Sequence, residues 1–274
     1  VTTGDNYTDD GLKAQDKESN LGKVLRMNFD GSAPEDNPEP GLLMWSYGHR
    51  NVQGLTFLPN GNIFTSEHGD AIEDEVNFIK KGANYGWPYV EGPCDADYEE
   101  DFCSSENPED PAFSSGNDRT FAMCGLEFYD HDRYPSLKQS LLLATLKRGT
   151  LFQLHLNEDM DEVVDTDEHL NFSVGRIRDF AITDDGRIFI CTSNRQILAQ
   201  PPFPFAEDDR ILELIPVDPE GKGTLDAPDF YLIKARPGDE LQFLVPISNT
   251  GDAPSKVTNI VNQSPNPELK HQHW

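Results

Sequence analysis

The chain is poor in basic residues and has no long hydrophobic run. Its 274 residues include 22 Lys and Arg against 49 Asp and Glu, which gives a formal net charge of −27 at pH 7. Such a charge opposes binding to polyanions, so neither nucleic acid nor an anionic membrane surface is an expected partner. A span across a bilayer needs roughly 18 or more consecutive apolar residues, and the sequence contains no such stretch. Hydrophobic residues still make up 36% of the chain, which is enough for a substantial core.

Cysteine is also scarce. The chain has 4 cysteines, and none stands in the Cys-x-x-Cys spacing of a zinc site: Cys94, Cys103, Cys124 and Cys191. Cys94 and Cys103 lie close together in a segment rich in Asp, Glu, Pro and Ser. They could close a small disulfide in an exported protein, or they could remain free surface thiols. The sequence leaves both alternatives open.

Short hairpins recur along the chain, and no convincing long amphipathic helix accompanies them. Residues 55–66 and 180–191 each read as a strand, a tight Asn-Gly or Asp-Gly turn and a second strand. Their turn glycines are separated by about three propeller repeats of roughly 40 to 45 residues. Residues 140–156 and 22–28 supply further strands of the same kind. The pattern predicts an all-β protein with the closed architecture of a β-propeller.

The domain organisation follows from changes in composition. Residues 1–217 are expected to form the propeller portion, with 93–119 as a long acidic loop between blades. The first residues lack the features of a signal peptide and read as the end of a strand, so we expect amino-terminal blades to be missing from this chain. Residues 218–229 read as a linker. Residues 230–274 read as a short β-rich segment and a candidate part of a sandwich module.

Basic side chains occupy corresponding places before or between the predicted strands: Arg50, Lys147, Arg176 and Arg178. If these places lie at one end of a propeller, the four cations would converge on a pocket suited to a small polyanion. In the alternative, each cation pairs with a local carboxylate such as Asp179 or Glu67, which is the usual arrangement of surface charges.

Three motifs carry a resemblance to a known family. Residues 48–54 read GHRNVQG, residues 66–77 read SEHGDAIEDEVN, and residues 82–88 read GANYGWP. They resemble, in order, the GHRNPQG, EHGP…DEIN and GxNYGWP signatures of the soluble PQQ-dependent glucose and aldose sugar dehydrogenases. LKRG at 146–149 and RIRD at 176–179 are similar too. The resemblance covers roughly residues 1 to 215 and implies a six-bladed propeller that binds PQQ and calcium.

The resemblance also implies which residues form the site. The cofactor-binding residues would be Arg50, Asn51, His68, Ala122, Lys147, Arg176 and Arg178. The carbonyl groups of Gly69 and Asp70 would hold a calcium on the cofactor, and Glu75 and Tyr85 would bind a second, structural calcium. The catalytic base would be a histidine upstream of Val1, with Arg50 in a supporting role. Asp70 stands where the family usually has proline, which alters the local charge.

The activity implied by the resemblance is oxidation of an aldose to its lactone. Hydride would pass to PQQ, and the reduced PQQ would then give its electrons to an external acceptor. The resemblance also implies a secreted or periplasmic protein. This chain by itself is expected to hold at most part of the site. Two alternatives stay open: a calcium-dependent lactonase on the same type of propeller, and a non-catalytic propeller that binds carbohydrate or serves in adhesion.

Overall fold

The structure is a computed structural model, which describes all residues except 8, 172, 196–208, 216–224, 227–247 and 250–274. The chain divides into two compact units, Val1–Leu214 and Ile215–Trp274. Most regular elements in the described residues of the first unit are short strands, with one short helix, α1 (Glu100–Glu106), and two 3-10 helices, η1 (Asp9–Ala14) and η2 (Pro135–Leu137). The prediction of an all-β protein is confirmed.

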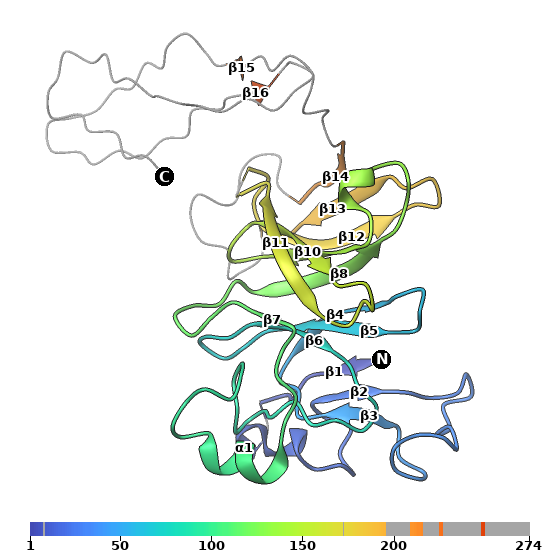
Figure 1. Ribbon diagram of the computed structural model, residues 1–274, viewed down its shortest axis with the longest axis vertical. Coiled ribbons are helices and arrows are strands. Elements are labelled where there is room, and N and C mark those ends of the chain that lie inside the picture. Colours follow the sequence, from blue (N-terminus) through green and yellow to red (C-terminus); the bar gives the residue numbers. More distant parts are fainter. Residues whose placement is uncertain (8, 172, 196–208, 216–224, 227–247, 250–274) are drawn as a thin grey trace, which may run out of the picture. The chain divides into compact units, whose positions relative to one another are not determined.

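Four antiparallel sheets follow one another along the described part of the first unit (Figure 1). The first contains β1 (Thr2–Thr3), β2 (Lys23–Leu25) and β3 (Met44–Tyr47). The second contains β4 (Val52–Phe57), β5 (Ile63–Glu67), β6 (Glu75–Phe78) and β7 (Phe113–Ser114). The third contains β8 (Met123–Tyr129), β9 (Ser140–Thr145), β10 (Leu151–Leu156) and β11 (Val163–His169). The fourth contains β12 (Ile177–Ile182), β13 (Ile188–Thr192) and β14 (Ile211–Leu214). Each strand pairs with its neighbour in sequence, as in a propeller blade.

The first strands of successive sheets lie against one another. β1 contacts β4, β4 contacts β8, and β8 contacts β12. β4 and β8 approach so closely at Gly54 that a side chain there would collide with the carbonyl oxygen of Cys124. This order places the starts of the sheets side by side, as neighbouring blades require. The described sheets do not close into a ring, so the number of blades stays a prediction.

The core lies between the sheets, and β9 is buried on both faces. Leu141 and Leu143 pack toward the second sheet in a cluster with Phe64. Leu142 and Ala144 point the other way, into a cluster with residues of the fourth sheet such as Ile177 and Ile190. Burial of one leucine side chain contributes about 1.5 to 3 kcal/mol, so this uninterrupted apolar strand fixes the third sheet between its two neighbours.

The predicted hairpins are confirmed, but the prediction for residues 93–119 is wrong in part. The segment carries α1 and β7, and β7 pairs with β6 at the edge of the second sheet. The part up to β7 is therefore an insertion within the second sheet, and only the residues after Ser114 connect this sheet to the third. The single-sequence pattern missed β7 because two residues are too few to show an alternation. Cys94 and Cys103 form a disulfide, which confirms the first of the two alternatives.

The second unit is described only in part. β15 (Leu225–Asp226) pairs antiparallel with β16 (Ser248–Asn249). Apart from these residues, the predicted linker 218–229 and the predicted segment 230–274 lie outside the described residues. No helix in the described ranges is long and apolar enough to cross a membrane.

Candidate functional site

A buried carboxylate at the end of β5 fixes the loop before β4. Glu67 is 3% exposed, and its oxygens lie 2.8 Å from His49 Nδ1, the Arg50 main-chain nitrogen and Asn77 Nδ2. Burial raises the pKa of Glu67, but the charge and hydrogen bond of His49, together with the other two donors, hold it below its ordinary value. His49 Nε2 lies 2.9 Å from Ser46 Oγ. The backbone of Arg50 is therefore held by an ordered, buried network.

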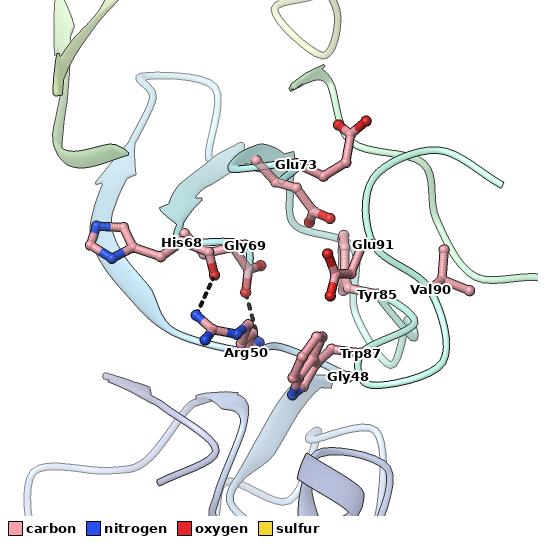
Figure 2. A pocket seen from close by; sticks show the side chains of 11 residues that line it. Gly48, Arg50, His68, Gly69, Glu73, Tyr85, Trp87, Val90 and Glu91 are labelled. Carbon is pink, nitrogen blue, oxygen red and sulfur yellow. Dashed lines mark hydrogen bonds between the residues drawn. The ribbon is translucent and has the colours of Figure 1, made fainter. Parts of the chain in front are cut away.

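The guanidinium of Arg50 is buried and contacts four neighbours, of which Figure 2 shows His68 and Trp87. It donates to the carbonyl oxygen of His68 at 3.3 Å, to Asp70 Oδ1 at 2.7 Å and to the Tyr7 hydroxyl at 3.3 Å. It also lies 5.3 Å from the ring centroid of Trp87. Within the described residues, the buried Nε of Arg50 has no hydrogen-bond partner. Asp70, the departure from the family pattern, therefore acts as the counterion of Arg50.

The segment after β5 turns sharply at Gly69. A side chain at this position would collide with the carbonyl oxygen of Ile72, so only glycine fits. The Gly69 N–H donates to Asp74 Oδ1 at 3.0 Å. No hydrogen bond from the described part of the chain ends on the carbonyl oxygens of Gly69 and Asp70. These two predicted metal-binding oxygens thus keep their acceptor capacity.

The segments that carry Ala122 and Lys147 are joined through their main chains. Ala122 has a left-handed backbone with φ of 55° and stands just before β8. Its carbonyl accepts the Leu146 N–H at 3.0 Å, and the Phe121 carbonyl accepts the Lys147 N–H at 2.9 Å. Lys147 Nζ donates to Thr120 Oγ1 at 2.8 Å. The turn after β9 is thereby fastened to the entrance of β8.

Arg178 on β12 contacts Gln53 on β4, and Arg176 immediately precedes β12. Arg178 Nη1 donates to Gln53 Oε1 at 3.2 Å, and Gln53 Nε2 donates to Asn51 Oδ1 at 2.9 Å. Arg176 is 9% exposed, and its Nε donates to the Ser193 carbonyl at 3.0 Å. Burial, and then the neighbouring charge of Arg178, lower the pKa of Arg176. Two sheets therefore contribute to one cationic region.

The charges of both Arg50 and Arg178 act on His68. Burial, followed by the charges of Arg178 and Arg50, lowers the pKa of His68 to about 4, against a smaller opposing effect of the Met123 main chain. The imidazole is therefore neutral at pH 7. Its Nε2 is buried and, among the described residues, has no hydrogen-bond partner. Figure 2 shows the ring pointing away from the glutamates beside Arg50.

The structure thus brings together Arg50, His68 and Arg178, with Asn51 joined to Arg178 through Gln53. Arg176 adjoins Arg178, whereas Lys147 and Ala122 join the group through the entrance of β8. Pairing with a local carboxylate, the alternative to a common pocket, holds for the side chain of Arg50. The carboxylate that pairs with the Arg50 side chain is Asp70, whereas Glu67 accepts a hydrogen bond from the Arg50 main chain.

An acidic pocket lies on the other side of Arg50. Its lining includes four glutamates: Glu67, Glu73, Glu75 and Glu91 (Figure 2). Burial, and then the charge of Glu67, raise the pKa of Glu75 to about 8, and burial also raises the pKa values of Glu73 and Glu91. Glu75 accepts hydrogen bonds from the Gly92 N–H and from Asn77 Nδ2, both at 2.8 Å. This much buried acid is costly without a cation.

Tyr85 lines the same pocket, but its hydroxyl is already used. The hydroxyl donates to the Phe78 carbonyl at 2.6 Å and accepts the Lys80 N–H at 2.9 Å. Its ring stacks on His49 with centroids 4.6 Å apart. A metal ion bound at Tyr85 would therefore use its main-chain oxygen. Across the described ranges, no three His, Cys, Asp or Glu side chains are arranged to hold a metal ion, so main-chain ligands would be needed.

Sequence reasoning missed several residues that organise the site. Glu67 was considered only as a surface partner, and Asp74 was not singled out, although both stand in the 66–77 motif. Their burial could not be read from the motif, because acidic residues are usually exposed. Trp87 stands in the 82–88 motif and was given no chemical role, yet it lies against Arg50 and lines the acidic pocket.

The successive antiparallel sheets and the adjoining basic and acidic regions define a propeller-type all-β protein with a site of mixed charge. A family model described as Glucose / Sorbosone dehydrogenase matches residues 1–199. The chain belongs to this family, and the resemblance expected from the motifs is confirmed.

Two relatives and one solved structure are similar to this chain. Quinoprotein glucose dehydrogenase B of Acinetobacter calcoaceticus is 50% identical over 88 residues, which cover 31% of this chain and 18% of that protein. Aldose sugar dehydrogenase YliI of Escherichia coli K12 is 33% identical over 189 residues, covering 65% and 50% respectively. The structure of the PQQ-bound aldose sugar dehydrogenase of Streptomyces coelicolor matches with 34% identity and a TM-score of 0.63 over 77% of this chain and 56% of that one. The chain spans about half the length, or less, of these relatives.

Proposed function

We propose that the protein to which this chain belongs oxidises an aldose sugar to its lactone with PQQ as the hydride acceptor. The observation that carries the proposal is a chain of contacts around His68: the Arg50 guanidinium donates to the His68 carbonyl, the His68 N–H donates to the Asn51 carbonyl, and Gln53 joins the Asn51 side chain to Arg178. Family membership and the PQQ-bound relative support the same reaction class. The proposal makes residues 1–217 part of a six-bladed propeller, followed by a linker over 218–229 and a separate β-rich segment over 230–274.

The residues fit a planar tricarboxylic quinone. Arginine forks suit carboxylates, and a cationic region is unusual in a chain of net charge −27. The partnerless buried Nε–H of Arg50 would gain from a bound acceptor, and the partnerless Nε2 of neutral His68 would gain from a bound hydrogen-bond partner, because an unsatisfied buried polar atom costs about 1 to 3 kcal/mol. Arg176 and Lys147 would add charge, Asn51 a hydrogen bond, and the small Ala122 side chain room. PQQ, when bound, supplies the two-electron acceptor.

Calcium is the metal proposed for the oxygen ligands. The carbonyl oxygens of Gly69 and Asp70, which accept no hydrogen bond from the described residues, suit a hard cation. A second calcium would bind the carboxylate of Glu75 and the main chain of Tyr85. The raised pKa of Glu75 supports a cation there, because a positive ion would relieve the crowding of buried acid.

The role of this chain in the chemistry is mainly to bind and orient. Arg50 would stabilise negative charge that develops during the reaction, and neutral His68 would contribute a hydrogen bond without adding charge. The resemblance assigns no residue of this chain as the base that takes the sugar proton. Electrons would leave to an external acceptor. The disulfide between Cys94 and Cys103 supports a secreted or periplasmic location.

The test is the melting temperature in calcium with and without PQQ. At a PQQ concentration about 100 times Kd, the gain is about 2.7 kcal/mol, which corresponds to a rise of about 5 to 10 °C. Arg178→Ala should abolish the rise. Arg187→Ala, at the far end of the same hairpin and paired with Asp185, should keep it.

The outcomes separate the alternatives. A third sample with a chelator in place of calcium completes the test: a rise on adding calcium but none on adding PQQ would contradict the PQQ-dependent dehydrogenase and favour the lactonase. No response to either ligand would favour a non-catalytic propeller. A PQQ-dependent rise that persists in Arg178→Ala would refute the proposed pocket.

A further inference from the structure

We propose that Asp74 is a positioning residue of the cofactor site, which fastens the Gly69 turn of the second sheet to the entrance of β8 in the third. The inference rests on the proposed function. Its basis is the buried carboxylate of Asp74, whose two oxygens bind main-chain N–H groups of both segments.

Asp74 stands immediately before β6 and is fully buried, at 0% exposure. Its Oδ1 accepts the Gly69 N–H at 3.0 Å. Its Oδ2 accepts the Phe121 N–H at 2.5 Å and the Met123 N–H at 3.3 Å. All of these donors are main-chain groups, and within the described residues no side-chain cation pairs with this carboxylate.

The two bound segments carry much of the proposed site. One contains the Gly69 and Asp70 carbonyls. The other contains Ala122 in its left-handed conformation, and its Phe121 carbonyl in turn holds the main chain of Lys147. Asp74 is thus the shared anchor of the proposed metal oxygens and of the turn that leads to Lys147. If Asp74 no longer binds both segments, the Gly69 and Asp70 carbonyls can move relative to the turn that leads to Lys147 without either sheet unfolding.

Only a carboxylate can serve both sides. Each of its oxygens is an acceptor, and all of the facing groups are donors. In Asp74→Asn the amide nitrogen must face either Gly69 or the pair Phe121 and Met123, and it would there oppose a donor with a donor. One segment is therefore released, while the volume of the side chain is unchanged.

Asp74 is itself held in place by Ser115. The Asp74 N–H donates to Ser115 Oγ, and the Ser115 N–H donates to the Asp74 carbonyl, both at 2.9 Å. Ser115→Ala removes the first of these bonds, together with the hydrogen bond from Ser115 Oγ to the Arg119 carbonyl at 2.9 Å, and keeps the second. It is therefore a milder variant that perturbs the same anchor and leaves its carboxylate intact.

The experiment compares PQQ affinity in the full chain at saturating calcium and at a temperature where circular dichroism shows every variant folded. Asp74→Asn is expected to raise the PQQ dissociation constant at least tenfold, and Ser115→Ala about threefold. Two controls should change it less than twofold: Glu127→Gln, an isosteric change on β8, and Leu142→Ala, which destabilises the core. Amide exchange without PQQ should accelerate at Gly69 or at Phe121 in Asp74→Asn and stay unchanged along β9.

The results distinguish this inference from the function on which it rests. If the wild type binds no PQQ, the proposed function fails and takes the positioning role with it. If the wild type binds PQQ and Asp74→Asn binds it equally well, only the role of Asp74 is overturned. An equal loss in Leu142→Ala would also overturn it, since stability alone would then explain the effect. If Asp74→Asn does not fold, Ser115→Ala decides: threefold weaker binding supports the anchor, and unchanged binding refutes it.

Discussion

Replacement of Glu67 by glutamine tests whether a buried carboxylate network supports the site. Glu67→Gln keeps the size of the side chain but removes its charge, and it turns one of two acceptor atoms into a donor. The carboxylate accepts from His49, Arg50 and Asn77 at 2.8 Å each. At least one of these donors must then face another donor in a fully buried place.

The expected cost is about 3 kcal/mol, because a hydrogen bond to a buried charged group contributes roughly 1.5 to 3 kcal/mol and the abandoned donor adds a desolvation penalty. For a domain of this size, that corresponds to a fall of about 6 to 12 °C in melting temperature. Urea denaturation measures the free energy of unfolding, and thermal denaturation measures the melting temperature.

The control is Glu109→Gln. Glu109 Oε2 lies 2.6 Å from Lys80 Nζ, but the two side chains are 32% and 51% exposed. Water screens such a pair, so the change should cost less than about 1 kcal/mol. Equal losses in the two variants, or a loss below 1 kcal/mol for Glu67→Gln, would refute the view that the buried network holds Arg50.

Two further predictions concern charge. Burial lowers the pKa of Lys23 to about 8, and its Nζ donates to three main-chain carbonyls. The unfolded chain then binds more protons than the folded chain between pH 8 and about 10.5. The free energy of unfolding, compared with Lys23→Met, should therefore rise across that window by at most about 3 kcal/mol, and a flat difference in urea titrations would contradict the burial. Asp70→Asn should tighten PQQ binding about fivefold in calorimetry. A carboxylate at a distance of order 8 Å from an anion costs about 1 kcal/mol at an effective dielectric constant of about 40. Weaker binding would show that Asp70 supports the site through its pair with Arg50.

The strand pairs were predictable where short-range chemistry decides them. The turn at Gly61 sits between alternating apolar residues, and the strands on either side pair as expected. β9 was recognisable from an apolar run that the structure buries on both faces. β7 was not, because its two residues pair with β6 across a long insertion and depend on contacts far away in sequence.

The site was predictable as a set of residue types but not as a set of contacts. The cations before the strands were identified from their repeat positions, and Arg50 and Arg178 do act on the same histidine. The buried acids Glu67 and Asp74 stand among other acids in one motif, and only the fold separates those that bind main-chain N–H groups from those that face solvent. The ion pair between Asp70 and Arg50 likewise depends on the turn at Gly69.

The most direct test of the central claim is the binding of PQQ to the wild-type chain, measured by calorimetry with calcium and again after chelation. The account predicts about one PQQ per chain in calcium and loss of binding when calcium is removed. PQQ binding of equal strength without calcium would contradict the proposed role of the Gly69 and Asp70 carbonyls. No binding under either condition would contradict the cofactor site itself.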